Sequence, residues 1–276
     1  MSYNERRKLL SDLESRRGSL IISMVYSRHA WMSTDDATLV YEVLSHSLRS
    51  RKVERVERIE IVLDSLGGEA AAAYKIVNVA RMFAEELNVI VVEKAKSAAT
   101  LLALGSDKIY MTRFAELGPI DPIVSHPIMT NIMIPARAVQ MFIDNVLPLL
   151  LEKYGPSIAD YFMKIDYNHI GFCRAAMKEA EEYAKLLLRK YHMRGKPSSE
   201  IEETVKKLLS YPSHDFVIGF EEARDMGLNI ELLKPDEEDL VWRLYREYGR
   251  SLDDVVLIVE TKEYSREVKR PKVTIW

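Results

Sequence analysis

Two apolar runs, each ending in small residues, constrain this chain more than any other feature. The run over residues 58–64 leads into Gly67 and Gly68, and the run over residues 88–92 leads to Ser97. β-Branched apolar runs of this length predict buried strands. If the two strands are parallel neighbours, the glycine pair and the serine lie at one edge of the sheet. Backbone N–H groups beside a serine hydroxyl suit acyl transfer, because charge develops on the attacked carbonyl oxygen. These runs therefore predict a serine hydrolase.

Strand-like and helix-like segments alternate in the first part of the chain. The predicted strands cover residues 19–26, 58–64, 88–92 and 108–112, and the predicted helices cover residues 5–17, 34–48, 69–86 and 97–104. Alternation at this spacing predicts parallel strands joined by right-handed crossovers. Nearly continuous apolar strands predict a sheet covered on both faces. The expected fold class is α/β.

The second half of the chain is predicted to be largely helical. After a proline-rich passage from Gly118 to Pro135, long helices are expected over residues 138–154 and 158–194. Ser199 and Glu202 predict a capping box at the start of the next helix. A short helix over residues 221–226, a strand over 229–233, a charged helix from 236 and a strand over 255–260 follow.

Three parts are expected along the chain: an amphipathic helix over residues 1–17, an α/β domain over 18–235 and an extension over 236–276. Leu9, Leu10 and Leu13 form a narrow apolar stripe on this helix, which is expected to pack on the body of the protein. The same stripe could also pack on a partner or on a membrane surface.

Composition excludes several classes of function. A net charge of -3 with interspersed signs gives no electrostatic basis for binding nucleic acid. No apolar run is long enough to span a bilayer and no signal-peptide pattern is present, so a cytoplasmic location is expected. The lone Cys173 excludes an internal disulfide and is expected to be a packing residue. A single glutamine, Gln140, among many charged residues suggests a thermophilic source.

No metal or cofactor is expected. Four of the histidines show no metal-ligand spacing, and no phosphate-binding glycine pattern accompanies Gly67 and Gly68. These four are His29, His46, His169 and His192.

Four motifs carry a resemblance to a known family. They are Leu66-Gly67-Gly68, the run from Lys96-Ser97-Ala98-Ala99-Thr100 to Ile109, Glu116-Leu-Gly-Pro-Ile-Asp-Pro122, and the Phe220–Leu228 segment with its late Gly-Leu pair. Over roughly residues 18–233 the chain resembles the serine dehydrogenase proteinase family. That family belongs to the Clp-protease-like and crotonase-like folds and is related to signal peptide peptidase A.

The resemblance implies a fold of repeated ββα units with a parallel sheet, and roles for named residues. It implies that Ser97 is the nucleophile and that the N–H groups of Gly68 and Ala98 form the oxyanion hole. It also implies a substrate-binding cleft that is lined by Gly67, Gly118, Pro119, Ile120 and Asp121. Two simpler interpretations stand beside these roles: Ser97 as a helix N-cap and the glycine pair as a tight turn.

The general base is not identified by the motifs. Ile120 occupies the position at which Clp-type proteases carry their histidine. His126 and His214 are equally ranked candidates, because a serine needs a neighbouring group to accept its proton. Lys94 and Lys96 flank the serine and rank lower, and Lys96 is expected to be a solvated surface charge.

Two other functions are weighed against a peptidase. One is a non-catalytic oligomeric scaffold, suggested by the missing base and the long helices. The other is crotonase-like binding of acyl-CoA thioesters, which Ser97 and the lack of a basic nucleotide-binding patch argue against. The expected partners are a peptide or protein substrate and further copies of the chain, as a trimer or larger ring.

Overall fold

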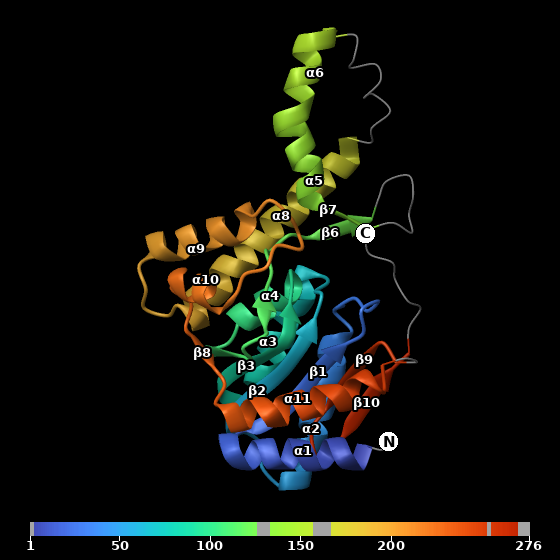
Figure 1. Cartoon of the computed structure of the whole chain (residues 1–276), viewed down its shortest axis with the longest axis vertical. Coiled ribbons are helices and arrows are strands. Elements are labelled where there is room, and N and C mark those ends of the chain that lie inside the picture. The colour runs from blue at the N-terminus through green and yellow to red at the C-terminus, as the bar shows by residue number, and fades with distance from the viewer. Residues whose placement is uncertain (1–2, 126–132, 157–166, 253–254, 270–276) are drawn as a thin grey trace.

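The fold is built on one mixed sheet. The computed structural model describes residues 3–125, 133–156, 167–252 and 255–269. In it the sheet has eight strands in the order β10-β9-β1-β2-β3-β4-β8, with β5 pairing with β3 (Figure 1). The strands are β1 (Leu20–Tyr26), β2 (Val56–Ser65), β3 (Ala84–Ala95), β4 (Lys108–Met111), β5 (Glu116–Leu117), β8 (Ile230–Leu232), β9 (Leu257–Glu260) and β10 (Ser265–Val268).

The central part of the sheet is parallel, as predicted. Strands β1, β2, β3, β4 and β8 pair in parallel, whereas β9 and β10 add an antiparallel edge beside β1. The carboxyl ends of β1, β2 and β3 therefore point the same way. The expected α/β class with a mostly parallel sheet is confirmed.

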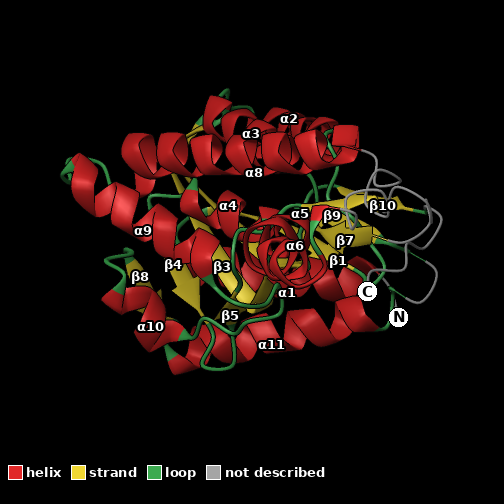
Figure 2. Ribbon diagram, turned by 90° about the horizontal axis from the view of Figure 1, so that it is seen from above, coloured by secondary structure: helices red, strands yellow, loops and turns green. Residues whose placement is uncertain are grey.

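Helices cover both faces of the sheet (Figure 2). One layer contains α2 (Asp36–Arg51), α3 (Ala70–Met82), α4 (Ala98–Leu104) and α8 (Tyr167–Leu187), which continues as the π-helical turn η3 (Leu188–His192). The other layer contains α1 (Tyr3–Arg17) and α11 (Pro235–Gly249). The helices α9 (Ser198–Ser210) and α10 (Phe220–Asp225) flank β4 and β8.

Each face of the sheet has its own apolar core. On the α1 and α11 side, Leu10 and Leu13 pack with Tyr248 against sheet residues such as Val62. The stripe of α1 is thus buried within the chain, in agreement with the sequence. Cys173 is 1% exposed and lies in a third, smaller cluster, as expected for a packing residue.

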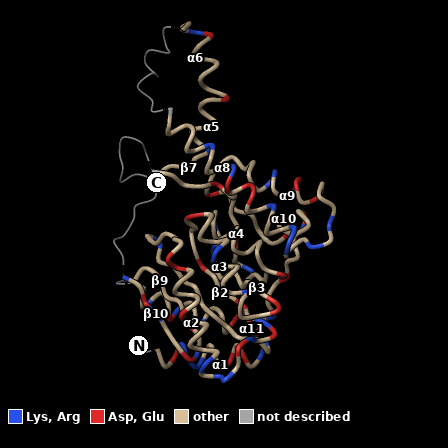
Figure 3. The backbone as a smooth tube through the Cα atoms, turned by 180° about the vertical axis from the view of Figure 1, so that it is seen from behind, with Lys and Arg blue, Asp and Glu red and all other residues tan. Residues whose placement is uncertain are grey.

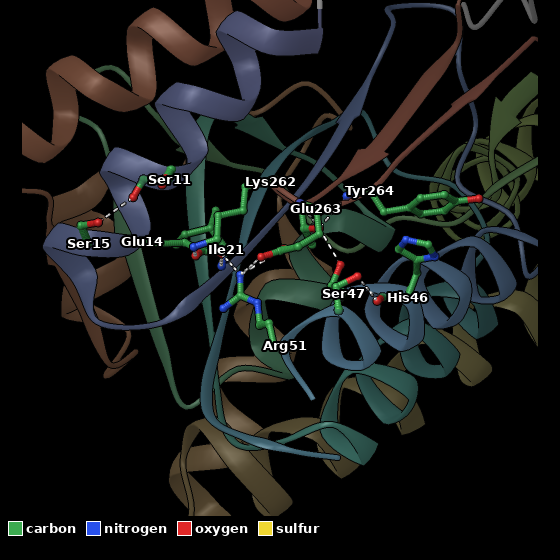
Figure 4. Close-up of polar contacts among 12 residues, drawn as sticks. Ser11, Glu14, Ser15, Ile21, His46, Ser47, Arg51, Lys262, Glu263 and Tyr264 are labelled. Carbon is green, nitrogen blue, oxygen red and sulfur yellow. Dashed lines mark hydrogen bonds and ion pairs between the residues drawn. The ribbon is translucent and has the colours of Figure 1, made fainter. Parts of the chain in front are cut away.

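A charged cluster joins α1 and α2 to the β9–β10 hairpin (Figure 4). Glu14 on α1 accepts from the Arg51 guanidinium at 2.5 Å and from Lys262 at 2.6 Å, and Arg51 also pairs with Glu263 at 2.9 Å. Glu14 is nearly buried, so these cations compensate for the desolvation of its carboxylate. The cluster fixes residues from both ends of the chain to one another.

Two sequence predictions of local structure are wrong. The helix expected over residues 69–86 ends at Met82, because residues from Ala84 onward pair with β2 and lengthen β3 to twelve residues. Tertiary pairing therefore overrides helix propensity there. The capping box at Ser199 does not form, since α9 begins at Ser198 after Pro197. The proline-rich passage also contains a small antiparallel pair, β6 (Ile123–Ser125) with β7 (Met133–Pro135).

A helical arm projects from the body of the protein (Figure 1). It consists of α5 (Ala136–Met141), the π-helical turn η1 (Phe142–Val146) and α6 (Leu147–Tyr154). α6 has no buried residue, and Leu149 is 63% exposed. Charged residues are spread over the body but sparse along this arm (Figure 3). None of the helices in the described residues has the length and apolar character needed to cross a membrane.

Candidate active site

Ser97 occupies a sharp turn between β3 and α4. Its φ of 49° and ψ of -115° lie in a region that residues other than glycine rarely adopt. Strained conformations of this kind cluster at functional sites, and a serine on a tight strand-to-helix turn is a known nucleophile geometry. The side chain makes no capping hydrogen bond to α4. The interpretation of Ser97 as a simple helix N-cap is therefore wrong.

Hydrogen bonds fix the main chain around Ser97. Its N–H donates to the Pro119 carbonyl at 3.2 Å, and the Lys96 N–H donates to the Ser65 carbonyl at 3.1 Å. Thr100, one turn into the helix, donates from its hydroxyl to the carbonyls of Ala95 and Gly118 at 2.6 and 2.8 Å. The strained turn is held between β2, β3 and the segment after β5.

The glycine pair after β2 lies directly against Ser97. A Cβ on Gly67 would lie 2.6 Å from the Lys96 carbonyl oxygen and 2.9 Å from the Ser97 Cβ, and the φ of Gly67 is +102°. A Cβ on Gly68 would lie 2.1 Å from the Met32 carbonyl oxygen. Only glycine fits at both positions. The two apolar runs of the sequence therefore do bring their ends together at one edge of the sheet.

Two backbone N–H groups beside Ser97 are unused. Among the described residues, neither the Gly68 N–H nor the Ala98 N–H donates a hydrogen bond. Ala98 is the first residue of α4, where N–H groups have no partner within the helix. A Cβ on Gly67 would be 3.1 Å from the Ala98 nitrogen, which shows how closely the two loops approach. Paired unused donors of this kind can bind an oxyanion.

The Ser97 hydroxyl is directed at Asp121. Its Oγ donates to the Asp121 backbone carbonyl at 3.1 Å, and the serine is 3% exposed. The carboxylate of the same residue lies near a histidine: His214 Nδ1 is 3.9 Å from Asp121 Oδ2. The Nδ1 atom is buried and has no hydrogen-bond partner among the described residues. Ser97, Asp121 and His214 are thus brought together by three separate loops.

The surroundings shift the pKa of both titratable groups, Asp121 and His214. Burial raises the pKa of Asp121 to about 6, although the Arg137 backbone N–H and guanidinium lower it. Burial lowers the pKa of His214, as does the Lys96 ammonium, while Asp215 raises it. A neutral imidazole can accept a proton, and it is available at neutral pH.

Arg137 holds the Asp121 segment in place. Its N–H lies 3.4 Å from Asp121 Oδ1, and its guanidinium donates to the Leu209 and Ser210 carbonyls, each at 2.7 Å. Those carbonyls form the C-terminal end of α9, where a cation is favourable. Asp121 is therefore clamped between α5 and α9.

Lys96 is buried, although the sequence predicts a solvated surface charge. It is 4% exposed, and its Nζ pairs with Glu116 at 2.7 Å and donates to the Phe216 carbonyl at 3.1 Å. The prediction of a solvated surface charge is wrong, because the side chain runs under the 212–218 segment. Its Nζ is already bound to Glu116 and the Phe216 carbonyl, so these contacts disfavour Lys96 as the base for Ser97.

The remaining predicted residues fall in different places. His126 lies outside the described residues. Gly118, Pro119 and Ile120 are buried, and Ile120 donates from its N–H to the Leu208 carbonyl at 3.0 Å.

A cavity of about 440 Å³ opens beside Asp121. Its described lining includes Arg28, His29 and Leu66, which follow β1 and β2, and residues 212–215 with His214. Residues of α5 also line it. Among the residues expected in the cleft, Asp121 lines this cavity whereas Gly67, Gly118, Pro119 and Ile120 are absent from its described lining.

Sequence reasoning missed the contribution of three residues. The motifs indicate Asp121 only as part of the cleft lining, and no motif indicates Arg28 or Arg137. The Glu116–Pro122 motif does contain Asp121, but its proximity to His214 depends on the antiparallel bridge between Leu117 and Ile218. That long-range bridge leaves no local pattern in the sequence. In the described part of the chain, no cluster of histidine, cysteine or acidic residues is arranged to hold a metal ion.

Comparison with known proteins gives a family match over nearly the whole chain. A model of the ClpP-like SDH-type serine proteinases matches residues 1–269. Two uncharacterized proteins of Methanocaldococcus jannaschii, MJ0137 and MJ1495, are 24% and 23% identical to this chain. The alignments cover 88% and 87% of this chain and 79% and 76% of those proteins.

Solved structures are similar at a lower level. A mutant of the 1510-N membrane-bound stomatin-specific protease is 19% identical with a TM-score of 0.44, covering 75% of this chain and 77% of that one. A second mutant of that protease, in complex with a substrate peptide, is 18% identical with a TM-score of 0.44, covering 89% and 86% of the two chains.

Proposed function

The chain belongs to the family of ClpP-like SDH-type serine proteinases, and we propose that it hydrolyses peptide bonds with Ser97 as the nucleophile. The observation that carries this proposal is the strained turn of Ser97 beside the two unused N–H groups of Gly68 and Ala98. As Ser97 Oγ attacks the scissile carbonyl carbon, the carbonyl oxygen becomes negative. The two N–H groups stabilise that charge without rearranging, which is the largest contribution in many acyl-transfer enzymes.

His214 is the proposed general base, with Asp121 as its orienting carboxylate. The imidazole takes the proton of Ser97 Oγ as the bond to the carbonyl carbon forms, and returns it to the leaving amine. Asp121 stabilises the imidazolium in between. The separation of 3.9 Å between the His214 and Asp121 atoms is longer than a hydrogen bond, and such contacts often shorten when substrate binds.

The observed rotamer of Ser97 corresponds to a resting state. The Oγ donates a hydrogen bond to the Asp121 backbone carbonyl, which is too weak a base to remove the proton from the hydroxyl. The serine is also nearly buried. Catalysis requires the hydroxyl to turn from this carbonyl to the imidazole. The cavity beside Asp121 is the proposed entrance for the peptide.

Replacement of Ser97 tests this proposal. The Ser97→Ala variant is expected to fold normally and to lose hydrolysis, because no other hydroxyl takes the place of Oγ. Labelling by a fluorophosphonate probe, mapped by mass spectrometry, is expected at Ser97 in the wild type and not in the variant. Thr100→Ser is a matched control, since it keeps the buried hydroxyl that donates to the Ala95 carbonyl from the first turn of α4. Peptide hydrolysis by Ser97→Ala at the wild-type rate would refute the proposal.

Self-association is part of the proposal. The arm of α5, η1 and α6 exposes apolar side chains, among them Leu149 and Leu151, and contiguous exposed apolar surface often marks an interface between copies. The expected assembly is a trimer or a larger ring. Light scattering measures it directly, and a monomeric mass at micromolar concentration would contradict it. Leu149→Lys is expected to lower the mass while leaving the Tm of the body unchanged.

A further inference from the structure

Arg28 stands out among the residues that line the cavity. It is exposed, it follows β1, and its guanidinium has no hydrogen bond or ion pair among the described residues. Arg137, which lines the same cavity, instead has its guanidinium bound to the Leu209 and Ser210 carbonyls. Of the two arginines in the described lining of this cavity, Arg28 alone keeps its charge free for a ligand. Arginine is well suited to bind a carboxylate through two parallel hydrogen bonds.

The order of the strands places Arg28 relative to the reacting groups. β1, β2 and β3 are parallel neighbours, and their carboxyl ends lead to Arg28, to the Gly67-Gly68 pair and to Ser97. His214 belongs to the segment that runs along β5, which pairs with β3 on the side opposite β2. A peptide lying across these strand ends therefore meets Arg28 on one side of Ser97 and His214 on the other.

The charged residues of the cavity are also distributed unevenly between Arg28 and His214. Arg28 is followed in the chain by His29. The acidic residues in the described lining, Asp121 and Asp215, are instead close to His214, because Asp215 is its neighbour in the chain and Asp121 Oδ2 lies 3.9 Å from its Nδ1. An acidic group on the His214 side would be repelled by these carboxylates. An acidic group on the Arg28 side would meet an unpaired cation.

We infer that the enzyme selects peptides with an acidic side chain on the N-terminal side of the cleaved bond, which Arg28 binds. This inference rests on the proposed function. The base must reach the leaving amine, so the C-terminal part of the substrate lies toward His214. The N-terminal part then extends past the Gly68 loop toward Arg28. Arg28 is in this sense a specificity-determining residue and takes no part in proton transfer.

The test uses the full chain and a synthetic peptide library, with cleavage sites read by mass spectrometry. Matched peptides that differ by glutamate or glutamine at one position then give a ratio of kcat/KM. Glutamate is expected to be preferred by about fivefold at a position N-terminal to the cleaved bond, as befits a partly exposed ion pair. Arg28→Gln is expected to abolish the preference, and Arg28→Glu to reverse it toward lysine.

The controls separate this inference from the proposed function. Arg7→Gln removes an exposed arginine from α1, on the far side of the body, and should leave the glutamate preference intact. If the wild type cleaves no peptide and no probe labels Ser97, the proposed function fails and the inference fails with it. If the wild type cleaves peptides but shows no glutamate preference, or Arg28→Gln retains it, the inference alone is overturned.

Discussion

The two halves of the candidate site are built in different ways. The oxyanion half, at Gly67, Gly68 and Ala98, consists of backbone at the ends of neighbouring strands, and a Cβ on either glycine would lie less than 3 Å from other backbone atoms. The base half consists of the Asp121 and His214 side chains, which come from loops distant in sequence and stand 3.9 Å apart. The first half is fixed by close packing, whereas the second depends on burial and on charges that titrate.

This difference predicts different responses to perturbation. A steric change in the oxyanion half has no room to relax, so it moves Ser97 itself and affects all pH values alike. A change in the base half alters proton affinities, so its effect depends on pH.

The largest effect is expected from Gly67→Ala. The added Cβ would lie 2.6 Å from the Lys96 carbonyl oxygen at a φ of +102°, so the loop must shift away from Ser97. Loss of an oxyanion donor alone costs about 10²–10³ in kcat. A loss of more than about 10³, equal at pH 6 and pH 8, is expected in peptide hydrolysis because the serine moves as well.

Gly219→Ala is the matched control for this variant. Gly219 has an ordinary backbone conformation, and no atom lies within 4 Å of an added Cβ. The peptide hydrolysis activity of the Gly219→Ala variant should stay within a few-fold of the wild-type activity. If Gly67→Ala were fully active, the oxyanion half would not be rigid, and the contrast between the two halves would fail.

His214→Gln is expected to have the next largest effect. A general base contributes about 10²–10⁴ to the rate, so kcat should fall within that range while fluorophosphonate labelling of Ser97 slows. His29→Gln changes another histidine of the same cavity, which is exposed and follows β1. Equal losses in the two variants would show that the cavity needs both histidines and that His214 has no special role.

The meeting of the glycine pair with Ser97 could be predicted from the sequence, because its information is local. The apolar runs before Gly67 and Ser97 specify parallel strands, and parallel strands bring their carboxyl ends to one edge. The close approach of Gly67 to Ser97 then follows from the pairing of β2 with β3, whereas the strained φ and ψ of Ser97 have no signal in the sequence. The same local reasoning correctly predicted the central sheet, α1 and the packing role of Cys173.

The base half could not be predicted in the same way. His214 reaches Asp121 because residues near Ile218 pair with Leu117, and this pairing joins segments about a hundred residues apart. Lys96 was misjudged for the same reason: its partner Glu116 and the carbonyl of Phe216 cover it only after the chain returns. Residue types and spacing alone can only rank His214 and His126 as equal candidates for the general base.

His192, a buried histidine outside the candidate site, tests whether burial alone makes a histidine functional. His192 lies near the Ser106 carbonyl through Nδ1 at 3.1 Å and accepts from the Asn229 N–H through Nε2 at 3.0 Å, so both nitrogens are used. Burial lowers its pKa from 6.5 to about 4. The folded state therefore binds fewer protons than the unfolded state between those values, and stability falls as pH falls from 6.5 to 4.

The loss attributable to His192 is expected to be roughly 3 kcal/mol in the free energy of unfolding. Urea unfolding of the wild type and of His192→Gln, measured from pH 7.5 to pH 4.5, isolates this contribution. The variant should be less stable at neutral pH but show a flatter decline with acid. Parallel pH curves for the two proteins would show that His192 does not titrate as its burial predicts.

The smallest effect is expected at Arg137, and it addresses the electrostatic half most directly. Asp121 has a pKa of about 6, and it must be ionised to stabilise the His214 imidazolium. Burial lowers the pKa of His214 below its ordinary value, so its neutral form is available at neutral pH. Activity should therefore rise with pH through about 6. Arg137 lowers the pKa of Asp121, so Arg137→Gln should move this rise to higher pH by up to about one unit.

Arg137→Lys keeps the positive charge but not the planar fork that binds the Leu209 and Ser210 carbonyls. It should therefore leave the pH of the rise nearly unchanged while lowering kcat/KM through looser positioning of Asp121. Arg243→Gln on α11 is a control that should change neither quantity. A merely structural role for Arg137 would lower activity equally at all pH values in both variants, and the base half would then be as sterically fixed as the oxyanion half.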